Sequence, residues 1–369
     1  MALSGDPELS ESENRRVESL LQRIERLVPR ILDQGFGDRG WYAEGVHPGR
    51  ISANTGLLEL LMALRCARGR DYFATRPNAH WITLRWVMEL LENEGRPTFP
   101  NRGTYGDRHC ITVPAMLSHC GDFALGFGSV PDSCKPALQW AYETIVERSE
   151  LAGTWRPFWQ EPGKRSFNIF VYPHHALHVL LHWPIGQVSQ NPSAMMPKTI
   201  VDTTHGYFCT RPIWRDNQDC IVTFYLNLGP RGFHAPQKCG VLTIWFQGMR
   251  FDWSTGLAKA VPVWYRARED GSFAVRLYKE HELHWLIVDT SGESGATLVI
   301  IAKGRAFEPQ ASQPGLDPTP RLKTSDSKTD PIYLFASDPV ALSEAIIGSD
   351  EVQVGPQTIR LSEVERLFG

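Results

Sequence analysis

The spacing of apolar residues changes near Thr199, and this change constrains the fold more than any other feature of the chain. Before it, apolar side chains recur every three or four residues, a spacing that predicts amphipathic helices. After it, apolar and polar residues alternate, which predicts strands. We therefore expect an α+β multidomain chain, with a helical domain over residues 1–195 and a β domain over residues 196–369.

Six helices are expected in the N-terminal part. The first spans residues 9–37, with Ser10 or Ser12 as its N-cap. Its apolar residues form one stripe: Val17, Leu20, Leu21, Ile24, Leu27, Val28 and Ile31. The remaining helices are expected over residues 52–68, 81–93, 111–120, 135–149 and 168–183. Short and long polar loops alternate between them.

The clearest strands of the C-terminal part lie within residues 206–253. Residues 221–228 alternate at Val222, Phe224 and Leu226, as in a half-buried strand, and Gln247-Gly248-Met249 predicts a hairpin turn. The strands expected here cover residues 207–212, 221–228, 241–246 and 250–253. Later strands are expected at 273–278, 283–289, 297–302, 331–336 and 352–361, with a short helix at 340–347 and an exposed loop at 307–330.

One sequence motif opens this β part. Gly206, Tyr207, Arg211 and Trp214 follow the pattern G-Y-x-x-x-R-x-x-W, which resembles the first strand of the β-sandwich in heparinase II/III-like polysaccharide lyases. In that family a Gly- and His-containing loop comes next, and then a strand that ends in an x-G turn and a buried Asp. The matching segments here are residues 229–234, residues 242–248 and Asp252.

The resemblance extends upstream, and it implies both a fold and an activity. Residues 49–66 and 86–107 resemble the last helical hairpins of the α/α-toroid that precedes the sandwich. The chain thus looks like a short, divergent member, with an incomplete α/α-toroid followed by an antiparallel β-sandwich. A uronate lyase must neutralise a carboxylate, remove the proton beside it and protonate the leaving oxygen. In the family, Tyr and His side chains move the protons, and Asn or Arg often holds the carboxylate.

His234 is the residue to which the resemblance assigns catalysis. It takes the place of the first His in the family's G-x-H-x-H-x-D loop and lies in a Gly-rich break between two strands. The second His and the Asp of that loop are replaced by Pro236 and Lys238. Because proline cannot bind a metal, we expect no zinc beside Asp252 unless the strands bring His281 or His284 close to it. The sequence has no G-x-G-x-x-G motif and no P-loop, and we expect no cofactor.

A second group of candidates lies in the loop over residues 38–50 and just after it. This loop resembles the family segment D-G-x-x-x-E-G/S, which usually places a catalytic Tyr a few residues later. Tyr42 or His47 is expected to replace that Tyr. Glu44, Arg50 and Asn54 are expected to line the substrate cleft, although capping of the helical ring explains the same residues.

The remaining candidates are distributed along the helical part. Tyr105 lies in a second long loop and is a further candidate for proton transfer. Trp155, Arg156 and Trp159 form a basic and aromatic loop that suits an anionic sugar. His175 is expected to face the cleft, whereas its neighbours at positions 174, 178 and 182 share one helix face and are expected to pack.

Composition limits the class of protein, its partners and the compartment in which it acts. With 42% hydrophobic and 21% charged residues the chain is typical of a globular protein, and no apolar run is long enough to span a membrane. The net charge of −3 provides no basic surplus for nucleic acid. The 7 scattered cysteines and the absence of a secretory signal favour reduced thiols in a cytoplasmic protein.

Three functions fit these observations. The first is a lyase that abstracts a proton and performs β-elimination on an anionic, uronate-like saccharide. The second is a cytoplasmic enzyme that uses the same scaffold for elimination or cyclisation of a small molecule in a biosynthetic pathway. The third is a non-catalytic carbohydrate-binding protein, because a fold alone does not fix a function. The expected partner is a saccharide or a small molecule, with no nucleic acid and no membrane.

Overall fold

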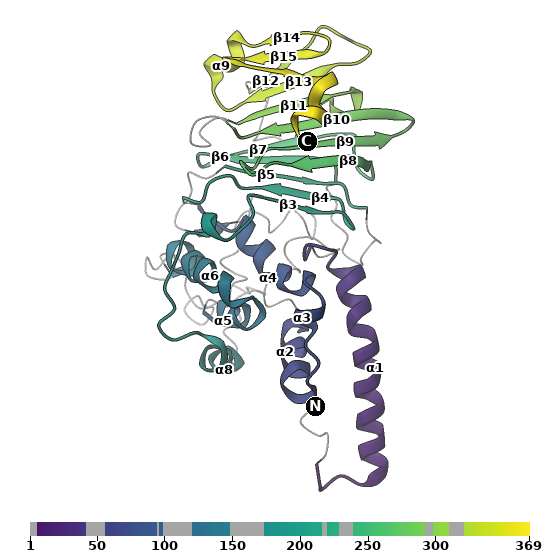
Figure 1. Cartoon of the computed structure of the whole chain (residues 1–369), viewed down its shortest axis with the longest axis vertical. Coiled ribbons are helices and arrows are strands. Elements are labelled where there is room, and N and C mark those ends of the chain that lie inside the picture. The colour runs from purple at the N-terminus through teal and green to yellow at the C-terminus, as the bar shows by residue number, and fades with distance from the viewer. Residues whose placement is uncertain are drawn as a thin grey trace, which may run out of the picture.

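The protein is an α+β chain whose helices precede its antiparallel sheets (Figure 1). The architecture is taken from a computed structural model. It describes residues 6–41, 56–93, 96–98, 120–147, 173–215, 220–228, 239–291, 298–309 and 321–369. The general class expected from the change in apolar spacing is therefore confirmed.

The described helices agree with most of the expected ones. They are α1 (Glu11–Gly35), α2 (Leu57–Arg68), α3 (Tyr72–Thr75), α4 (Asn78–Glu89), α5 (Cys120–Ser129), α6 (Lys135–Ala141) and α8 (Pro173–His182). A short π-helix, η2 (Tyr142–Val146), continues α6. Two differences stand out. The third helix was expected to reach residue 93, but it ends at Glu89 and is followed by a small hairpin of β1 (Leu91–Asn93) and β2 (Arg96–Thr98). The helices α3 and α5 were not predicted, and the helix expected over residues 111–120 lies outside the described residues except for Cys120.

The long helix α1 begins where the sequence indicated. Ser10 caps it: the Glu13 amide donates to the Ser10 hydroxyl, and the Glu13 carboxylate accepts from the Ser10 amide. This reciprocal capping box satisfies two amides at the start of the helix. The apolar stripe is only partly covered, however, because Leu20, Leu27 and Ile31 remain 53%, 42% and 42% exposed.

The first sheet has five antiparallel strands in sequential order. They are β3 (Thr199–Asp202), β4 (Tyr207–Thr210), β5 (Cys220–Tyr225), β6 (Val241–Phe246) and β7 (Met249–Ser254). Phe246 pairs with Met249, so Gln247 and Gly248 form a two-residue turn, both with positive φ (49° and 75°). Positive φ at both turn residues matches the right-handed twist of a hairpin, and the predicted turn is confirmed.

The half-buried character predicted for the second strand is wrong, because β5 is buried on both faces. Val222 and Phe224 pack toward the second sheet, as their alternation suggested. Ile221 and Tyr225 point the other way and belong to the hydrophobic core that the helices form. The first sheet is thus an inner layer with a separate apolar core on each side.

The second sheet has six antiparallel strands and shares one core with the first. In spatial order they are β12 (Leu322–Thr324), β13 (Ile332–Ala336), β11 (Val299–Lys303), β10 (Glu282–Asp289), β9 (Phe273–Lys279) and β8 (Val261–Ala267). Phe273, Leu286 and Ile300 from this sheet lie in the same apolar cluster as Val222 and Phe224 of the first. The strands β3, β8 and β12 were not predicted. The expected loop at 307–330 is wrong where β12 lies, and the helix expected at 340–347 ends at Glu344 and is followed by a short strand at residues 346–347.

A third, smaller layer covers the far side of the second sheet. It contains α9 (Pro339–Glu344), β14 (Ile346–Ile347), β15 (Glu351–Val354), β16 (Gln357–Arg360) and α10 (Val364–Leu367). The single strand predicted at 352–361 is a hairpin that turns at Gly355, where φ is +56°. Figure 1 shows the layers stacked along the long axis, from the helices to this small sheet. None of the helices that the structure describes is long and apolar enough to cross a membrane.

Candidate functional site

The side chains nominated from the sequence lie almost entirely outside the described residues. For His175 the structure gives a position in α8 but describes no side chain. Outside the described ranges are His234, Tyr42, His47, Tyr105, Glu44, Arg50, Asn54, Trp155, Arg156 and Trp159. The structure does describe the residues to which these stretches are joined. Those residues form a buried junction between the helices and the first sheet.

An aromatic cluster centred on Trp41 lies in this junction. Trp41 is the last described residue before Tyr42, and it is fully buried. Its ring stacks on Tyr207, with ring centroids 3.7 Å apart and an interplanar angle of 15°. The ring of Tyr225 lies 4.9 Å away on the neighbouring strand. The chain therefore enters the stretch at 42–55 from a point fixed against the first sheet.

Below this cluster the helix α4 carries a buried ion pair. Arg85 and Glu89 are both fully buried, with Arg85 Nη1 3.3 Å from Glu89 Oε2. The Tyr207 hydroxyl donates to the other Glu89 oxygen, and Arg85 Nε donates to the Gly40 carbonyl at 3.2 Å. Burial raises the pKa of Glu89, an effect that the Arg85 charge opposes, and burial also raises the pKa of Tyr207 well above its usual range. Helix α4, the loop before Trp41 and strand β4 are thus joined through polar groups.

The other motif residues hold the end of α4. Arg211 Nη1 donates to the Leu90 carbonyl at 2.7 Å and to the Val87 and Met88 carbonyls at 3.3 Å each. Carbonyls at a helix end lack partners within the helix and carry partial negative charge, so a guanidinium stabilises them. The Arg211 guanidinium also lies 4.0 Å from the ring centroid of Trp214. Among the motif residues, Tyr207, Arg211 and Trp214 therefore join sheet to helix.

Asp202, at the end of β3, binds the loop that leads to Trp41. Its carboxylate accepts from the amides of Arg39 (2.9 Å), Trp41 (3.4 Å) and His205 (3.0 Å). Gly37 has φ of +58°, and a Cβ atom there would collide with this carboxylate. Glycine at position 37 therefore allows the close approach of loop and strand.

Two titratable groups of this turn have strongly altered pKa values. Burial, together with the neighbouring Asp38 carboxylate, raises the pKa of Asp202 to about 7. Burial lowers the pKa of His205 to about 4, so its imidazole is neutral at pH 7. The Asp38 charge and the Gly35 backbone oppose this lowering of the His205 pKa without overcoming it. These shifts mark the junction as electrostatically unusual, which is typical of functional sites but also of structural networks.

The stretch that carries His234 is joined to the same cluster. The Tyr225 hydroxyl donates to Asn227 Oδ1 at 3.2 Å, and Asn227 Nδ2 lies 3.5 Å from the sulfur of Cys239. Asn227 has φ of 57°, a left-handed conformation that Asn adopts more readily than most residues. Residues 229–238 lie between these two anchors. The contacts therefore run without a break from Trp41, beside Tyr42, through Tyr225 and Asn227 to Cys239.

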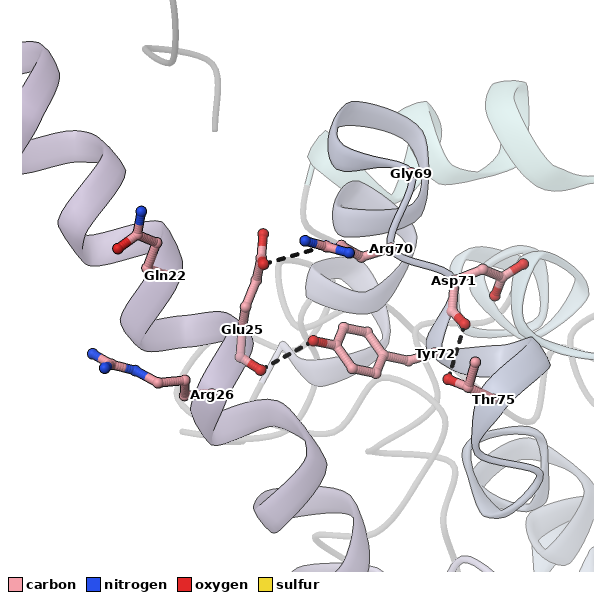
Figure 2. Close-up of a pocket in the computed structure, with 8 residues that line it drawn as sticks. All are labelled: Gln22, Glu25, Arg26, Gly69, Arg70, Asp71, Tyr72 and Thr75. Carbon is pink, nitrogen blue, oxygen red and sulfur yellow. Dashed lines mark hydrogen bonds and ion pairs between the residues drawn. The ribbon is translucent and has the colours of Figure 1, made fainter.

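Two pockets lie beside α3, away from the second sheet. One, of about 460 Å³, is lined by Asp38, Arg39 and Thr204 and by residues around Arg76. The other, of about 630 Å³, separates α1 from the α2–α3 connection (Figure 2). Glu25 spans its wall: one oxygen is 3.3 Å from Arg70 Nε, and its carbonyl accepts from the Tyr72 hydroxyl at 3.0 Å. In the part of the molecule that is described, no group of three or more His, Cys, Asp or Glu residues could hold a metal ion.

Four residues of the junction were not singled out from the sequence: Arg85, Glu89, Asp202 and His205. The first two lie four residues apart in α4, a spacing at which opposite charges pair. The other two gave no signal, since they belong to a strand and turn that were not predicted. No family model matches this chain, and no curated protein matches it either.

Proposed function

We propose that the chain is a lyase that abstracts a proton from an anionic, uronate-like saccharide and eliminates the glycosidic oxygen. We further propose that its helices form an incomplete α/α-toroid and that its two large sheets form a β-sandwich of the heparinase II/III-like type. The order of helices before antiparallel sheets supports this proposal. The position of Tyr207, Arg211 and Trp214 at the junction of helices and first sheet supports it too.

One observation carries the proposal. Tyr42 and His234 are far apart in sequence, but the described residues that flank their stretches are connected. Trp41 contacts Tyr225, and Tyr225 is linked through Asn227 to Cys239. A two-residue proton relay needs both groups near one substrate atom. Trp41 and Asn227 are buried and hydrogen-bonded, so the described residues from which the two stretches continue are held firmly.

The reaction balances without a cofactor. A base takes the proton from the carbon beside the uronate carboxylate, whose charge is neutralised by a cation such as Arg50 or Arg156. The electron pair forms a carbon–carbon double bond, and the glycosidic carbon–oxygen bond breaks. An acid returns a proton to the leaving oxygen. We assign the proton transfers to His234 together with Tyr42, His47 or Tyr105, because their side chains exchange protons near neutral pH or when activated by neighbours.

An ultraviolet assay tests this proposal, because the new double bond conjugated to the carboxylate absorbs in the ultraviolet. Wild type, His234→Ala and Tyr42→Phe are incubated with glycosaminoglycans and alginate. We expect wild-type activity, with a loss of at least about 100-fold in each variant. His281→Asn is the matched control, since His281 is an exposed histidine in the turn between β9 and β10. If wild type releases no absorbing product from any polysaccharide of the panel, the proposed polysaccharide lyase activity is excluded. If His234→Ala retains full activity, a catalytic role of His234 is excluded.

A further inference from the structure

The exposed side of α1 combines an uncovered apolar ridge with a row of arginines. Leu20, Leu27 and Ile31 are 53%, 42% and 42% exposed, whereas the apolar residues on the adjoining side of the same helix are buried. Leu20 and Leu27 are seven residues apart, and the half-buried Ile24 lies between them. Apolar residues that alternate at spacings of three and four form the seam of a coiled coil. The apolar stripe of α1 is therefore wider than the surface that the rest of the molecule covers.

The arginine row borders this ridge on its solvent side. Arg16, Arg23 and Arg30 are all exposed and are spaced seven residues apart, so they lie on one line along α1. Within the described part of the chain none of the three forms an ion pair, and Arg30 only donates to Gln34 at 3.1 Å. Successive positions in the row are about 10.5 Å apart along the axis. The row is a regular, positively charged edge beside an apolar seam.

We propose that this face of α1 binds an acidic amphipathic helix of a partner protein. The partner would place Leu or Ile against Leu20, Leu27 and Ile31, and Glu or Asp at a seven-residue spacing opposite the arginines. Charged residues that flank a heptad seam select partners by sign. Figure 1 shows α1 at the edge of the helical part, with its N-terminal end extending past the other helices.

The charges disfavour a second copy of this chain on the same face. In an antiparallel pair, two α1 helices packed through these ridges would bring their rows of arginines together, and like charges across a seam are destabilising. A membrane surface fits less well than a helix. The exposed ridge is only one residue wide, whereas helices that lie in a membrane interface present a broad apolar face.

The test uses two synthetic three-heptad peptides and the full chain. Both peptides have the same Leu/Ile seam, and they differ only in carrying Glu or Lys at the flanking positions. Fluorescence anisotropy at low ionic strength measures their affinities. We expect the Glu peptide to bind at least about tenfold more tightly, since three exposed ion pairs each contribute modestly. Added salt should remove this difference, because it screens exposed charges.

Variants of α1 show whether the row and the ridge are responsible. The triple change R16E/R23E/R30E should reverse the preference, so that the Lys peptide binds more tightly. Leu27→Ser should weaken binding of both peptides to similar extents. Arg26→Glu is the matched control, because Arg26 is an exposed arginine of the same helix that lines the pocket of Figure 2 instead. Thermal unfolding followed by circular dichroism confirms that each variant is folded.

Four outcomes would overturn the proposal. The first two are equal affinity for the two peptides and no binding of either. The third is binding of wild type to vesicles of anionic lipid when neither peptide binds, which would show a membrane surface. The fourth is self-association in sedimentation experiments that Leu27→Ser abolishes, which would show a second copy. None of these outcomes depends on the proposed lyase activity.

Discussion

At the scale of single residues, Asp202 and His205 have opposite effects on the pH dependence of stability. Asp202 has a pKa of about 7 in the folded chain against 3.8 ordinarily. Its contribution to the free energy of unfolding is therefore complete below pH 3.8 and is lost as the pH rises through 7. His205 has a pKa of about 4 against 6.5, so folding is favoured above pH 6.5 and is penalised as pH falls through 4. Between pH 4 and pH 6.5 the two slopes oppose one another.

This opposition predicts how two single variants should behave. In Asp202→Asn only the His205 slope remains, so the free energy of unfolding should rise with pH between pH 4 and pH 6.5. In His205→Gln only the Asp202 slope remains, and the same free energy should fall over this interval. Relative to wild type, the slope should change by up to about 1.4 kcal/mol per pH unit in each variant, upward in Asp202→Asn and downward in His205→Gln. Urea titrations across the interval measure all three, and parallel curves would contradict the prediction.

The same residues show why the sequence predicted the candidate site only in part. The local sequence TIVDTTH predicts only a turn at Asp202. Its partners, the amides of Arg39 and Trp41, lie more than 160 residues earlier in the chain. No local pattern encodes such a contact. The nominated side chains, His234 and Tyr42 among them, lie outside the described residues and stay predictions.

At the scale of elements, local patterns predicted which segments form strands but not what covers them. Alternation identified β5 and the Gln247-Gly248 turn identified the β6–β7 hairpin, because both signals depend on neighbours in sequence. The second buried face of β5 was missed, since Thr223 and Tyr225 are as common on a solvated face as beneath a helix. Similarly, the strand β8 was missed because five of its seven residues are exposed and give no clear apolar alternation.

The contact between Arg211 and α4 is an element-scale feature that can be tested. Arg211→Lys keeps the positive charge, but one ammonium cannot reproduce the planar contact with Trp214 together with bonds to three carbonyls. We expect the free energy of unfolding to fall by about 1–3 kcal/mol, measured by urea titration.

Arg276→Lys is the matched control for this change. Arg276 also lies over a tryptophan, with its guanidinium 5.4 Å from the ring centroid of Trp285, but it is partly exposed and pairs with Glu365 at the surface. Its replacement should change stability by less than about 0.5 kcal/mol. An equal loss of unfolding free energy in the two variants would show that the contact of Arg211 with the end of α4 does not stabilise the fold more than a surface arginine does.

At the scale of the whole molecule, one hydrophobic core spans the boundary between helices and sheets. Leu32, Leu61 and Ile82 of the helices belong to the same cluster as Ile221 and Trp245 of the first sheet. Polar contacts link the two sides as well. The Tyr207 hydroxyl donates to Glu89 of the buried Arg85–Glu89 pair, and the Asp202 carboxylate accepts from the Arg39 amide. The division at residues 195 and 196 stays a prediction about sequence organisation, and this shared core argues that the two parts depend on one another.

Dependence of this kind predicts that residues 196–369 do not form a native fold alone. Removing the helices would expose a whole face of the first sheet, including Tyr207, Ile221, Tyr225 and Trp245. Apolar patches of that extent favour association or loose packing. The isolated fragment should therefore bind a hydrophobic dye and lack the near-ultraviolet dichroism of packed aromatic rings. In the full chain, unfolding curves from tryptophan fluorescence and from far-ultraviolet dichroism should coincide, as in a single cooperative transition. A fragment that stays monomeric, binds no dye and unfolds cooperatively would show that the second and third layers suffice to stabilise the first sheet.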